Sequence, residues 1–413
     1  MIQTLYTASL FVYNCIFAFI SLFHSKAAKI INGRKESRSQ ISLLDDSRPP
    51  AIWFHCASLG EWEQTIPVVE KIKAESSYFI LLSFYSPSGF ENAKRADLID
   101  LKIYLPVDFI RNYRLIFQKF DIKTLVFTRY DLWPNLILAA NNLKIPLILI
   151  GAEFKAGSRY LRTNSFFYKL ISRFSYISCN DPASADLLIK AGLRHIGSDG
   201  SPKIERAVAN TKAKIAHELL SEWCKNDFII LGGSVWSQEI TLLAKFIQDH
   251  PSNIKVILAP HEPNDQSLKE IDDAFKAKVS RFSTLSEQDM DCQVIVIDSI
   301  GILSGLYHYA DTAVIGGGFG KGIHNILEAS VYGIPVISGP NNSKFSEADL
   351  LLNESVYFVA EDYNSFNKLI SEFMNDKNLR EKIKSKAAKF FEKQLGASQI
   401  ISTKILKIIS RDI

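Results

Sequence analysis

Short apolar segments of strand character alternate with segments of helical spacing along most of this 413-residue chain. In the first half the expected strands are 51–56, 78–84, 124–128 and 146–150, and the expected helices are 61–75, 109–120 and 132–143. Strands that alternate with helices form a parallel sheet, because each helix carries the chain back to the edge where the next strand begins. The pattern therefore predicts a doubly wound, Rossmann-like α/β domain at residues 40–215.

The same alternation begins again after a pause near residues 197–214. Its expected strands are 228–232, 255–259, 294–297, 312–315 and 335–338, and its expected helices are 238–249, 302–309 and 324–332. A chain of this length also exceeds what one hydrophobic core usually holds. We therefore expect a second Rossmann-like domain at residues 225–385, facing the first across a cleft, and a helical tail at 386–413.

The N-terminal segment differs in character from both domains. Residues 2–23 contain no charged side chain, and as a helix they are long enough to cross a bilayer. The stretch that follows holds one acid, Glu36, against the basic residues Lys26, Lys29, Arg34, Lys35 and Arg38. Basic residues favour the cytoplasmic side of a membrane. We therefore expect residues 1–25 to be a single inner-membrane anchor, joined by a polar linker at 32–50 to a body in the cytoplasm.

Two other interpretations of this segment stay open. A cleaved signal peptide places its positive charges before the apolar run, whereas here they follow it. A helix that lies in the membrane surface or packs on the body is the second alternative. The C-terminal tail and the segment just before it bear on the same question through their basic residues: Lys377, Arg380, Lys382, Lys384, Lys386, Lys389, Lys393, Lys404, Lys407 and Arg411. They either attract an anionic membrane or only solvate a packed helix.

Composition and cysteine spacing exclude several functional classes. The net charge of +4 is too small to indicate a nucleic-acid partner, and no arginine-rich or zinc-finger motif is present. The cysteines are scattered and never spaced as C-x-x-C, which indicates reduced thiols; they are Cys15, Cys56, Cys179, Cys224 and Cys292. No D-x-D motif stands at the end of an expected strand, so we expect neither a metal nor another cofactor.

Loops that follow strands are the first candidates for chemistry, because ligands of open α/β sheets bind beyond the carboxyl ends of the strands. Glu61 begins a helix just after the strand that ends at Cys56. Its carboxylate either accepts a proton from a nucleophilic hydroxyl or only stabilises the helix dipole. Asp131 follows the strand 124–128 and either caps a helix or holds a substrate hydroxyl. Lys203, in a glycine-containing turn, offers charge to a phosphate or is solvated surface.

The most specific loop is the glycine-rich run 316–325, which follows an expected strand. Backbone amides in such a loop can approach a phosphate, and the next helix adds its own N–H groups. We assign this role to Gly317, Gly318, Gly320, Gly322 and His324. Lys321 is followed by glycine rather than serine or threonine, so the run is not a P-loop. Glu328 is placed to accept hydrogen bonds from ribose hydroxyls; a purely structural glycine turn is the alternative.

Taken in order, these segments resemble the family of 3-deoxy-D-manno-octulosonic acid (Kdo) transferases of lipopolysaccharide synthesis, over nearly the whole chain. The matching elements are 55–61 (H-x-x-S-x-G-E), 131–135 (E-L-W-P-N, with Asp for Glu), 200–203 (G-x-x-K), 298–303 (D-T-M-G-E-L), 324–328 (H-N-x-L-E) and 333–345. Several elements in one order are far more specific than any one of them.

The resemblance implies an inverting GT-B glycosyltransferase that moves Kdo from CMP-Kdo onto the lipid A precursor, lipid IVA. It implies Glu61 as general base, with Asp131 and Lys203 stabilising the transition state. It assigns CMP binding to Pro260, His261, Ile300, Gly301, Ile302, Asn325, Ile326, Leu327 and Glu328. A CMP-sugar carries no diphosphate for a metal to bridge, so the resemblance implies no cofactor.

Three positions depart from the family's pattern. Asp131 is one methylene shorter than the usual Glu, His261 stands where Arg is frequent, and Ile302 stands where Glu is frequent. Three other functions stay open: a GT-B enzyme that uses a UDP-sugar, such as a lipid-disaccharide synthase; a sugar-nucleotide epimerase; and an anchored scaffold with a degenerate site, which the intact Glu61 disfavours.

Overall fold

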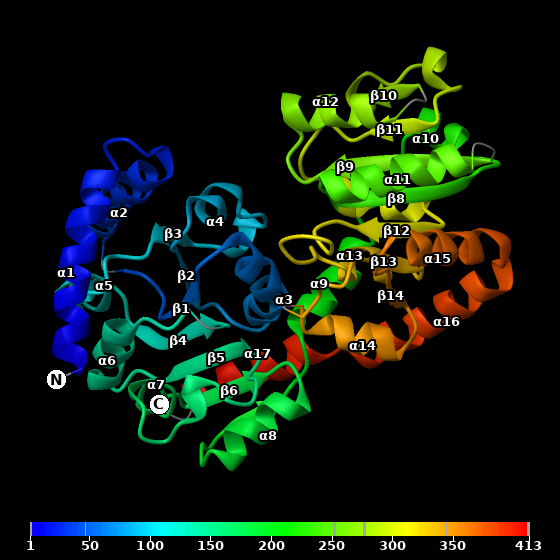
Figure 1. Cartoon of the computed structure of the whole chain (residues 1–413). Coiled ribbons are helices and arrows are strands. Elements are labelled where there is room, and N and C mark those ends of the chain that lie inside the picture. The colour runs from blue at the N-terminus through cyan, green and yellow to red at the C-terminus, as the bar shows by residue number, and fades with distance from the viewer. Residues whose placement is uncertain are drawn as a thin grey trace. The chain divides into compact units, whose positions relative to one another are not determined.

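The computed structural model describes residues 2–45, 47–129, 131–250, 253–275, 278–343 and 345–410, with side chains from residue 5 onward. The chain forms two compact units (Figure 1). The first comprises Met1–Arg206 together with Gln394–Ile413, and the second comprises Ala207–Lys393. The end of the chain therefore returns to the first unit instead of forming a separate tail. Arg411, the last basic residue of the expected tail, lies outside the described residues.

The first unit is built on a parallel sheet with the strand order β3-β2-β1-β4-β5-β6-β7. Four strands confirm expectations: β1 (Ala51–Cys56), β2 (Phe79–Phe84), β4 (Ile122–Thr128) and β5 (Leu147–Ala152). Three more are additional: β3 (Leu101–Tyr104), β6 (Tyr176–Cys179) and β7 (Ile196–Ser198). Runs of three or four residues carry little periodic signal, which is why the sequence pattern does not reveal them.

Helices cover both faces of this sheet (Figure 1). The helices of the first unit are α1 (Ile2–Ile20), α2 (Ser25–Leu43), α3 (Leu59–Glu75), α4 (Pro87–Asn92), α5 (Ile110–Lys119), α6 (Pro134–Asn142), α7 (Phe166–Ile171), α8 (Pro182–Lys190) and α17 (Ala397–Ser410). The boundary between the two units falls inside α9 (Pro202–Asn210). Trp53 shares one core with residues of α5 and α6, whereas its neighbour Phe54 shares the other core with α3 and α17. Successive strand residues point to opposite faces, so β1 contributes to both cores.

The second unit repeats this plan with the strand order β10-β11-β9-β8-β12-β13-β14, again all parallel. The strands are β8 (Phe228–Val235), β9 (Ile254–Pro260), β10 (Val279–Arg281), β11 (Val294–Val296), β12 (Thr312–Ile315), β13 (Val336–Ser338) and β14 (Tyr357–Val359). The helices are α10 (Glu218–Trp223), α11 (Ser237–Asp249), α12 (Asp265–Ala274), α13 (Leu327–Ser330), α14 (Glu347–Asn353), α15 (Tyr363–Asn375) and α16 (Lys377–Lys393). Two parallel, doubly wound α/β units are thus confirmed.

Two expected helices of the second unit are wrong in extent. Residues 302–309 form two 3₁₀ turns, Leu303–Gly305 and Tyr307–Tyr309, and 324–332 contains only the short α13. Each segment follows a glycine with positive φ, Gly301 at 93° and Gly322 at 113°. A residue in that backbone region cannot continue a right-handed helix, so regular structure begins only after the loop has turned.

The polar linker expected at 32–50 is also wrong, because α2 continues to Leu43. The buried stripe of α2 consists of Ala27, Ile30, Gly33, Ser37 and Ile41. A Cβ added to Gly33 would overlap the ring of Tyr104, and Ser37 Oγ accepts a hydrogen bond from Tyr104 N–H at 2.9 Å. Small and polar residues at helical spacing give a weak hydrophobic signal, so this packed helix has the composition of a linker.

No single helix in the described part of the chain is both long enough and apolar enough to cross a bilayer. Segments Leu5–Ile20 and Ser25–Leu43 satisfy that test only as a pair, and they meet at a bend of 116°. The spanning anchor expected from composition is therefore not confirmed.

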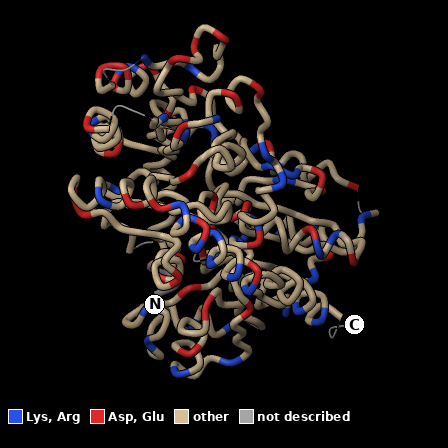
Figure 2. Tube along the Cα trace, turned by 90° about the vertical axis from the view of Figure 1, so that its right-hand side faces the viewer, with Lys and Arg blue, Asp and Glu red and all other residues tan. Residues whose placement is uncertain are grey.

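The last helix is an integral part of the first unit. Ile401, Ile405 and Ile409 of α17 are buried in the same core as residues of α3, whereas Lys404 and Lys407 are exposed. Packing thus accounts for the amphipathic pattern of this helix. Figure 2 shows basic and acidic residues interspersed along the trace.

We expect Gly33→Ala to lower the free energy of unfolding by about 1–3 kcal/mol, because the added methyl group forces α2 away from Tyr104. Urea titration measures the change. Gly60→Ala is the matched control, since nothing lies within 4 Å of a Cβ at that helical position. An equal loss of stability in both variants would contradict the close contact at Gly33.

Candidate functional site

Glu61 lies at the junction between strand β1 and the helix that follows it, α3. β1 ends at Cys56, Ser58 is the N-cap of α3, and Glu61 lies in the first turn. The Glu61 side chain turns back and accepts a hydrogen bond from Ala57 N–H through Oε2. Burial raises the pKa of the Glu61 carboxyl, while nearby His55 and the Ala57 N–H act in the opposite direction. The result is a fixed carboxylate that is more basic than an exposed one.

Asp131 lies in the loop after β4, the strand next to β1 in the sheet, and its carboxylate is held by aromatic side chains. Its Oδ2 is 3.1 Å from His55 Nε2 and accepts a hydrogen bond from Trp133 Nε1 at 2.9 Å. The other ring nitrogen of His55, Nδ1, lies 2.9 Å from Ser83 Oγ, which also accepts from Trp53 Nε1 at 2.9 Å. β1 and β4 are neighbouring strands, so the sheet itself brings His55 and Asp131 together.

The network around His55 orients the carboxylate of Asp131. The Trp133 Nε1–H is shared between Asp131 Oδ2 and His55 Nε2, each at 2.9 Å, so the two rings and the carboxylate form one hydrogen-bonded cluster. His55 is only 1 % exposed, and its ring cannot turn away into solvent. Asp131 also raises the pKa of the Glu61 carboxyl, so the two acids lie close enough to interact electrostatically.

Arg129 is a third charged group of this site that the sequence pattern does not single out. Its backbone is left-handed, with φ of 62°, and its Nη2 lies 3.4 Å from Glu153 Oε2. Its positive charge lowers the pKa of the Glu61 carboxyl. The only sequence signal is its position two residues before Asp131, because neither the unusual φ nor the electrostatic contact is visible in the chain order.

Lys203 occupies the first turn of α9, after Gly200 with φ of 89°. α9 is fixed to the rest of the first unit by two polar contacts. Arg206 Nε donates to Glu63 Oε2 on α3 at 2.7 Å, and Ser398 N–H of α17 donates to Glu205 Oε1 at 3.1 Å. Lys203 therefore belongs to the same unit as Glu61 and Asp131.

The glycine-rich loop of the second unit is organised around a buried carboxylate. Glu239 of α11 is fully buried and accepts hydrogen bonds from the N–H groups of Trp236 (3.0 Å), Gly317 (3.0 Å) and Phe319 (3.4 Å). Burial raises the pKa of Glu239, and the donating N–H groups oppose that rise. The site that sequence analysis assigns to a phosphate is thus partly filled by the protein's own anion.

Further N–H groups of this loop also donate internally. Those of Gly320 and Gly322 both bond to Gly317 O, at 3.0 and 2.9 Å. Within the described residues, the N–H groups of Gly318, Asn325 and Ile326 have no acceptor in hydrogen-bonding distance. They are the donors that the loop leaves for a bound anion.

Aromatic rings stack beside the loop. His261 stacks on Trp236 with ring centroids 4.5 Å apart and on His324 at 4.4 Å. Trp236 Nε1–H donates to His324 Nε2 at 3.0 Å, and Lys321 Nζ lies 4.4 Å from the centre of the Trp236 ring. Burial, with a smaller effect of His261, lowers the pKa of His324 to about 4. His324 is therefore neutral near pH 7, with its hydrogen on Nδ1.

The remaining residues expected at a nucleotide site fall into two groups. Pro260 ends β9 and leads directly to His261, and Asn325 Nδ2 donates to Glu328 Oε1 at 2.9 Å. The side chains of Ile326 and Leu327 are buried, so only their backbone can touch a ligand. Ile300, by contrast, is 86 % exposed, beside Gly301 and Ile302 in the segment after β11. The structure thus joins His261 to His324 and Asn325 to Glu328.

Comparisons with known sequences find 3-deoxy-D-manno-octulosonic acid transferases among the relatives of this chain. Residues 31–206 match the family model described as 3-deoxy-D-manno-octulosonic-acid transferase (kdotransferase). The chain is 27 % identical over 334 residues to the 3-deoxy-D-manno-octulosonic acid transferase of Aquifex aeolicus, covering 79 % of this chain and 87 % of that protein. It is 24 % identical over 415 residues to the enzyme of the same name from Haemophilus influenzae, covering 96 % of each chain.

Solved structures share the fold at low sequence identity. A UDP-GlcNAc 2-epimerase from Neisseria meningitidis has a TM-score of 0.62 at 14 % identity, covering 87 % of this chain and all of its own. A glycosyltransferase from Rickettsia africae has a TM-score of 0.60 at 12 % identity, covering 88 % of this chain and 98 % of its own. These likenesses show the fold alone.

We expect the His324 imidazole to become half protonated only near pH 4. Trp236→Phe should raise this pKa, because the neutral ring loses the N–H group that donates to it. NMR titration of the histidine ring resonances measures both values. His308, which lies elsewhere in the second unit, is the internal control and should titrate identically in both proteins. An unchanged His324 pKa in the variant would contradict the hydrogen bond.

Proposed function

The chain belongs to the family of 3-deoxy-D-manno-octulosonic acid (Kdo) transferases, and from this premise we propose that it moves Kdo from CMP-Kdo onto lipid IVA, the lipid A precursor. The chemical support for this proposal is the state of Glu61. Its carboxylate is held by a hydrogen bond, has a raised pKa and interacts electrostatically with Asp131. A general base works best when its pKa lies near the operating pH.

Glu61 acts as the base in a single displacement. It takes the proton of the acceptor hydroxyl as that oxygen attacks the anomeric carbon of Kdo, and CMP leaves from the opposite face with the electron pair of the broken bond. Asp131, held by His55 and Trp133, stabilises the positive charge that develops on the sugar. Lys203 stabilises the departing phosphate. The configuration of the transferred sugar is inverted because no enzyme nucleophile takes part.

CMP binds beside the glycine-rich loop of the second unit. The N–H groups of Asn325 and Ile326 and the Nδ1–H of neutral His324 are donors for its phosphate. Glu328 accepts from the ribose hydroxyls, and its hydrogen bond from Asn325 keeps the carboxylate in place. His261 is exposed and replaces the cation frequent at this position with a ring that stacks on Trp236. We expect no metal or other cofactor, because a monophosphate leaving group offers no diphosphate to chelate.

A UDP-sugar enzyme of the epimerase or disaccharide-synthase type is the second candidate that the fold allows. The epimerase likeness is at 14 % identity, where the fold is shared by unrelated functions. The relatives from Aquifex aeolicus and Haemophilus influenzae, in contrast, match most of the chain and are both 3-deoxy-D-manno-octulosonic acid transferases. This difference favours the Kdo donor.

The protein attaches to the inner membrane through α1, with its body in the cytoplasm. Polar groups of α1 face the first unit: Tyr6 OH donates to Asp108 Oδ2 at 2.8 Å, and Asn135 Nδ2 lies 3.4 Å from Thr7 Oγ1. Apolar side chains of the same segment are exposed: Leu5, Phe11, Val12, Ile16, Phe19, Leu22 and Phe23. A helix with one docked face and one free apolar face suits the interface of a membrane, and the basic residues of α2 follow it.

Replacing Glu61 by Gln tests the proposed base. The variant keeps the shape of the side chain and should lose about 10²–10⁴ in kcat, with unchanged CMP affinity. The wild-type rate should fall as the pH drops through the raised pKa of Glu61, because the protonated acid cannot accept a proton. That acid limb should vanish in the variant. Product mass after incubation with CMP-Kdo and lipid IVA gives the rate.

Two controls accompany this measurement. Glu91→Gln removes an exposed carboxylate that pairs with Lys29 and should leave kcat unchanged. The wild-type assay repeated in EDTA tests the expectation that no metal is needed. Near-normal turnover of Glu61→Gln would overturn the assignment of the base, and transfer from UDP-sugars alone would overturn the proposed donor.

The membrane attachment is tested with Ile16→Ser/Phe19→Ser/Phe23→Ser. These side chains are 54 %, 65 % and 80 % exposed, so their loss removes apolar contact with lipid without opening the core. We expect most of the variant to leave the membrane pellet while still using detergent-dispersed acceptor. The matched control, Leu143→Ser/Ile189→Ser/Leu395→Ser, removes exposed apolar residues elsewhere in the first unit and should stay in the pellet. Equal partitioning of both variants would exclude α1 as the attachment.

A further inference from the structure

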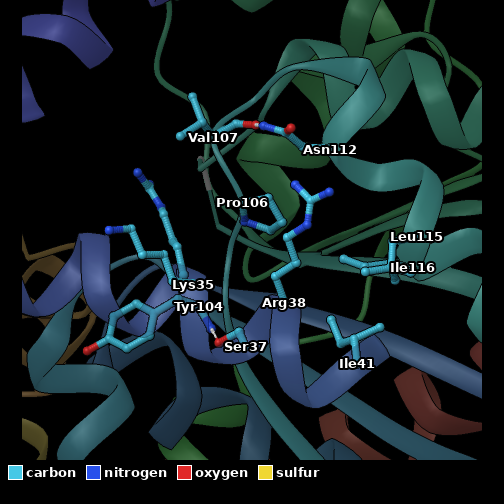
Figure 3. A pocket seen from close by; sticks show the side chains of 11 residues that line it. Lys35, Ser37, Arg38, Ile41, Tyr104, Pro106, Val107, Asn112, Leu115 and Ile116 are labelled. Atoms are coloured by element: carbon cyan, nitrogen blue, oxygen red, sulfur yellow. Dashed lines mark hydrogen bonds between the residues drawn. The ribbon is translucent and has the colours of Figure 1, made fainter. Parts of the chain in front are cut away.

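A pocket of about 190 Å³ lies between α2 and α5 (Figure 3), and neither Glu61 nor Asp131 is among its lining residues. Its walls differ in chemistry. Arg34, Lys35 and Arg38 of α2 contribute cationic groups, whereas Ile41, Leu115 and Ile116 contribute apolar ones. Figure 3 shows the Arg38 side chain extending toward Asn112. Such a pocket suits a ligand with an anionic head and an apolar body.

The packing of α2 explains why these cations gather here. Gly33, Ser37 and Ile41 recur at helical spacing and hold α2 against the body. Arg34 and Arg38 follow Gly33 and Ser37 by one residue each, so they lie along one edge of the buried stripe, one turn apart. The contact that fixes Gly33 and Ser37 at Tyr104 therefore also fixes the backbone positions from which Arg34 and Arg38 extend.

The positive charge of the pocket is not neutralised by the protein. In the described part of the chain, no carboxylate lies within ion-pair distance of Arg34, Lys35 or Arg38. Glu36, the acid next to Lys35 in the sequence, is also too far from these three cations to form an ion pair. Lys29 on the same helix differs, since its Nζ pairs with Glu91 at 2.8 Å. A cluster of cations without counter-charges is a binding site for an anion.

Arg34 is the most constrained of the three cations. Its Nε donates to Leu105 O at 2.9 Å, and its guanidinium carbon lies 5.6 Å from the centre of the Tyr85 ring. Burial lowers the pKa of Arg34, although a guanidinium remains charged at neutral pH. The Arg34 guanidinium has a carbonyl and the Tyr85 side chain as partners, both without a full charge, so an anion that reaches it supplies the missing counter-charge.

Tyr85 connects this pocket to the proposed catalytic carboxylates. Its ring packs against Trp133 at 5.3 Å, and Trp133 Nε1 is the donor that holds Asp131. Arg34, Tyr85, Trp133 and Asp131 thus form a continuous series of contacts within the first unit.

A second hollow begins farther along α5. It has a volume of about 580 Å³ and lies between Ala8 and Phe11 of α1 and Phe109, Ile110 and Arg111. Its lining is mainly apolar, and it opens on the helix that we assign to the membrane surface. The first unit therefore offers a cationic pocket and an apolar hollow along one helix.

We propose that the pocket formed by Arg34, Lys35 and Arg38 binds a phosphate monoester of the lipid acceptor, whose acyl chain enters the hollow between α1 and α5. This inference rests on the proposed function, because there the acceptor is a phosphorylated glycolipid. The pocket selects the acceptor by its phosphate and holds its sugar at the Asp131 loop. Lys35 and Arg38 are specificity residues that take no part in proton transfer.

Binding of a simple lipid phosphate tests the pocket independently of transfer. Dihexanoyl phosphatidate is titrated calorimetrically into the full-length protein, with dihexanoylglycerol and inorganic phosphate as comparison ligands. Lys35→Gln/Arg38→Gln should weaken phosphatidate binding about tenfold, because charge-assisted hydrogen bonds are lost. Lys26→Gln/Lys190→Gln removes the same charge at exposed positions outside the pocket and should bind as the wild type does.

Each comparison ligand and the control variant can overturn the proposal by a specific result. Binding of inorganic phosphate as tight as that of phosphatidate would assign the pocket to free phosphate and overturn the lipid proposal. Equal binding of dihexanoylglycerol would show that charge is irrelevant. Equal weakening in the Lys26/Lys190 variant would reduce the effect to net charge. The last two outcomes overturn the proposal as well.

Transfer kinetics then identify the lipid. With lipid IVA, Lys35→Gln/Arg38→Gln should raise the acceptor KM about tenfold and leave kcat and the donor KM unchanged. The difference from wild type should disappear with an acceptor whose phosphates have been removed. An unchanged acceptor KM beside weakened phosphatidate binding would assign the pocket to membrane phospholipid and overturn the acceptor role. Absence of any transfer by the wild type would overturn the proposed function, while the titration still decides the pocket.

Discussion

A buried carboxylate, Asp108, joins the elements on which the first unit depends. Its side chain accepts hydrogen bonds from Tyr6 OH (2.8 Å), Tyr113 OH (2.7 Å) and the N–H groups of Asn135 (3.0 Å) and Leu136 (2.9 Å). Burial raises its pKa, and these donors counteract the rise. A fully buried acid is tolerated only when its oxygens are satisfied, so α1, α5 and the start of α6 are held in one arrangement. The position of α1 is thereby coupled to that of the Asp131 loop.

The same arrangement explains how one unit can serve lipid and chemistry together. α6 begins directly after the loop that carries Asp131 and Trp133, and α5 forms a wall of both hollows. The acceptor that we propose must present a hydroxyl to a base while its chains stay in an apolar environment. Helices that dock on the sheet through polar contacts and leave apolar side chains exposed meet both requirements.

The sequence motif predicts the position of the glycine-rich loop but not the contacts of its N–H groups. Its position after a strand is as expected, and Gly317 has φ of 87°, a backbone conformation that only glycine adopts readily. The motif does not reveal that Glu239, 78 positions away, takes the N–H of Gly317. A loop whose backbone N–H groups point into one hollow binds an anion there, and in this protein the carboxylate of Glu239 on α11 is that anion.

Sequence by itself determined the two parallel α/β units, because alternating periodicity is a local property that each segment carries independently. It also determined that Glu61 and Asp131 follow strands, and so lie at the ligand-binding edge of a sheet. Only the tertiary structure decided that His55 and Trp133 hold Asp131, that α2 is a packed helix and that α17 returns to the first unit. These features arise from contacts between distant parts of the chain. The order of the strands in each sheet cannot be recognised from hydrophobic periodicity. The same holds for the buried residues around Gly33 and, within the described residues, for the absence of counter-charges beside Arg34 and Arg38.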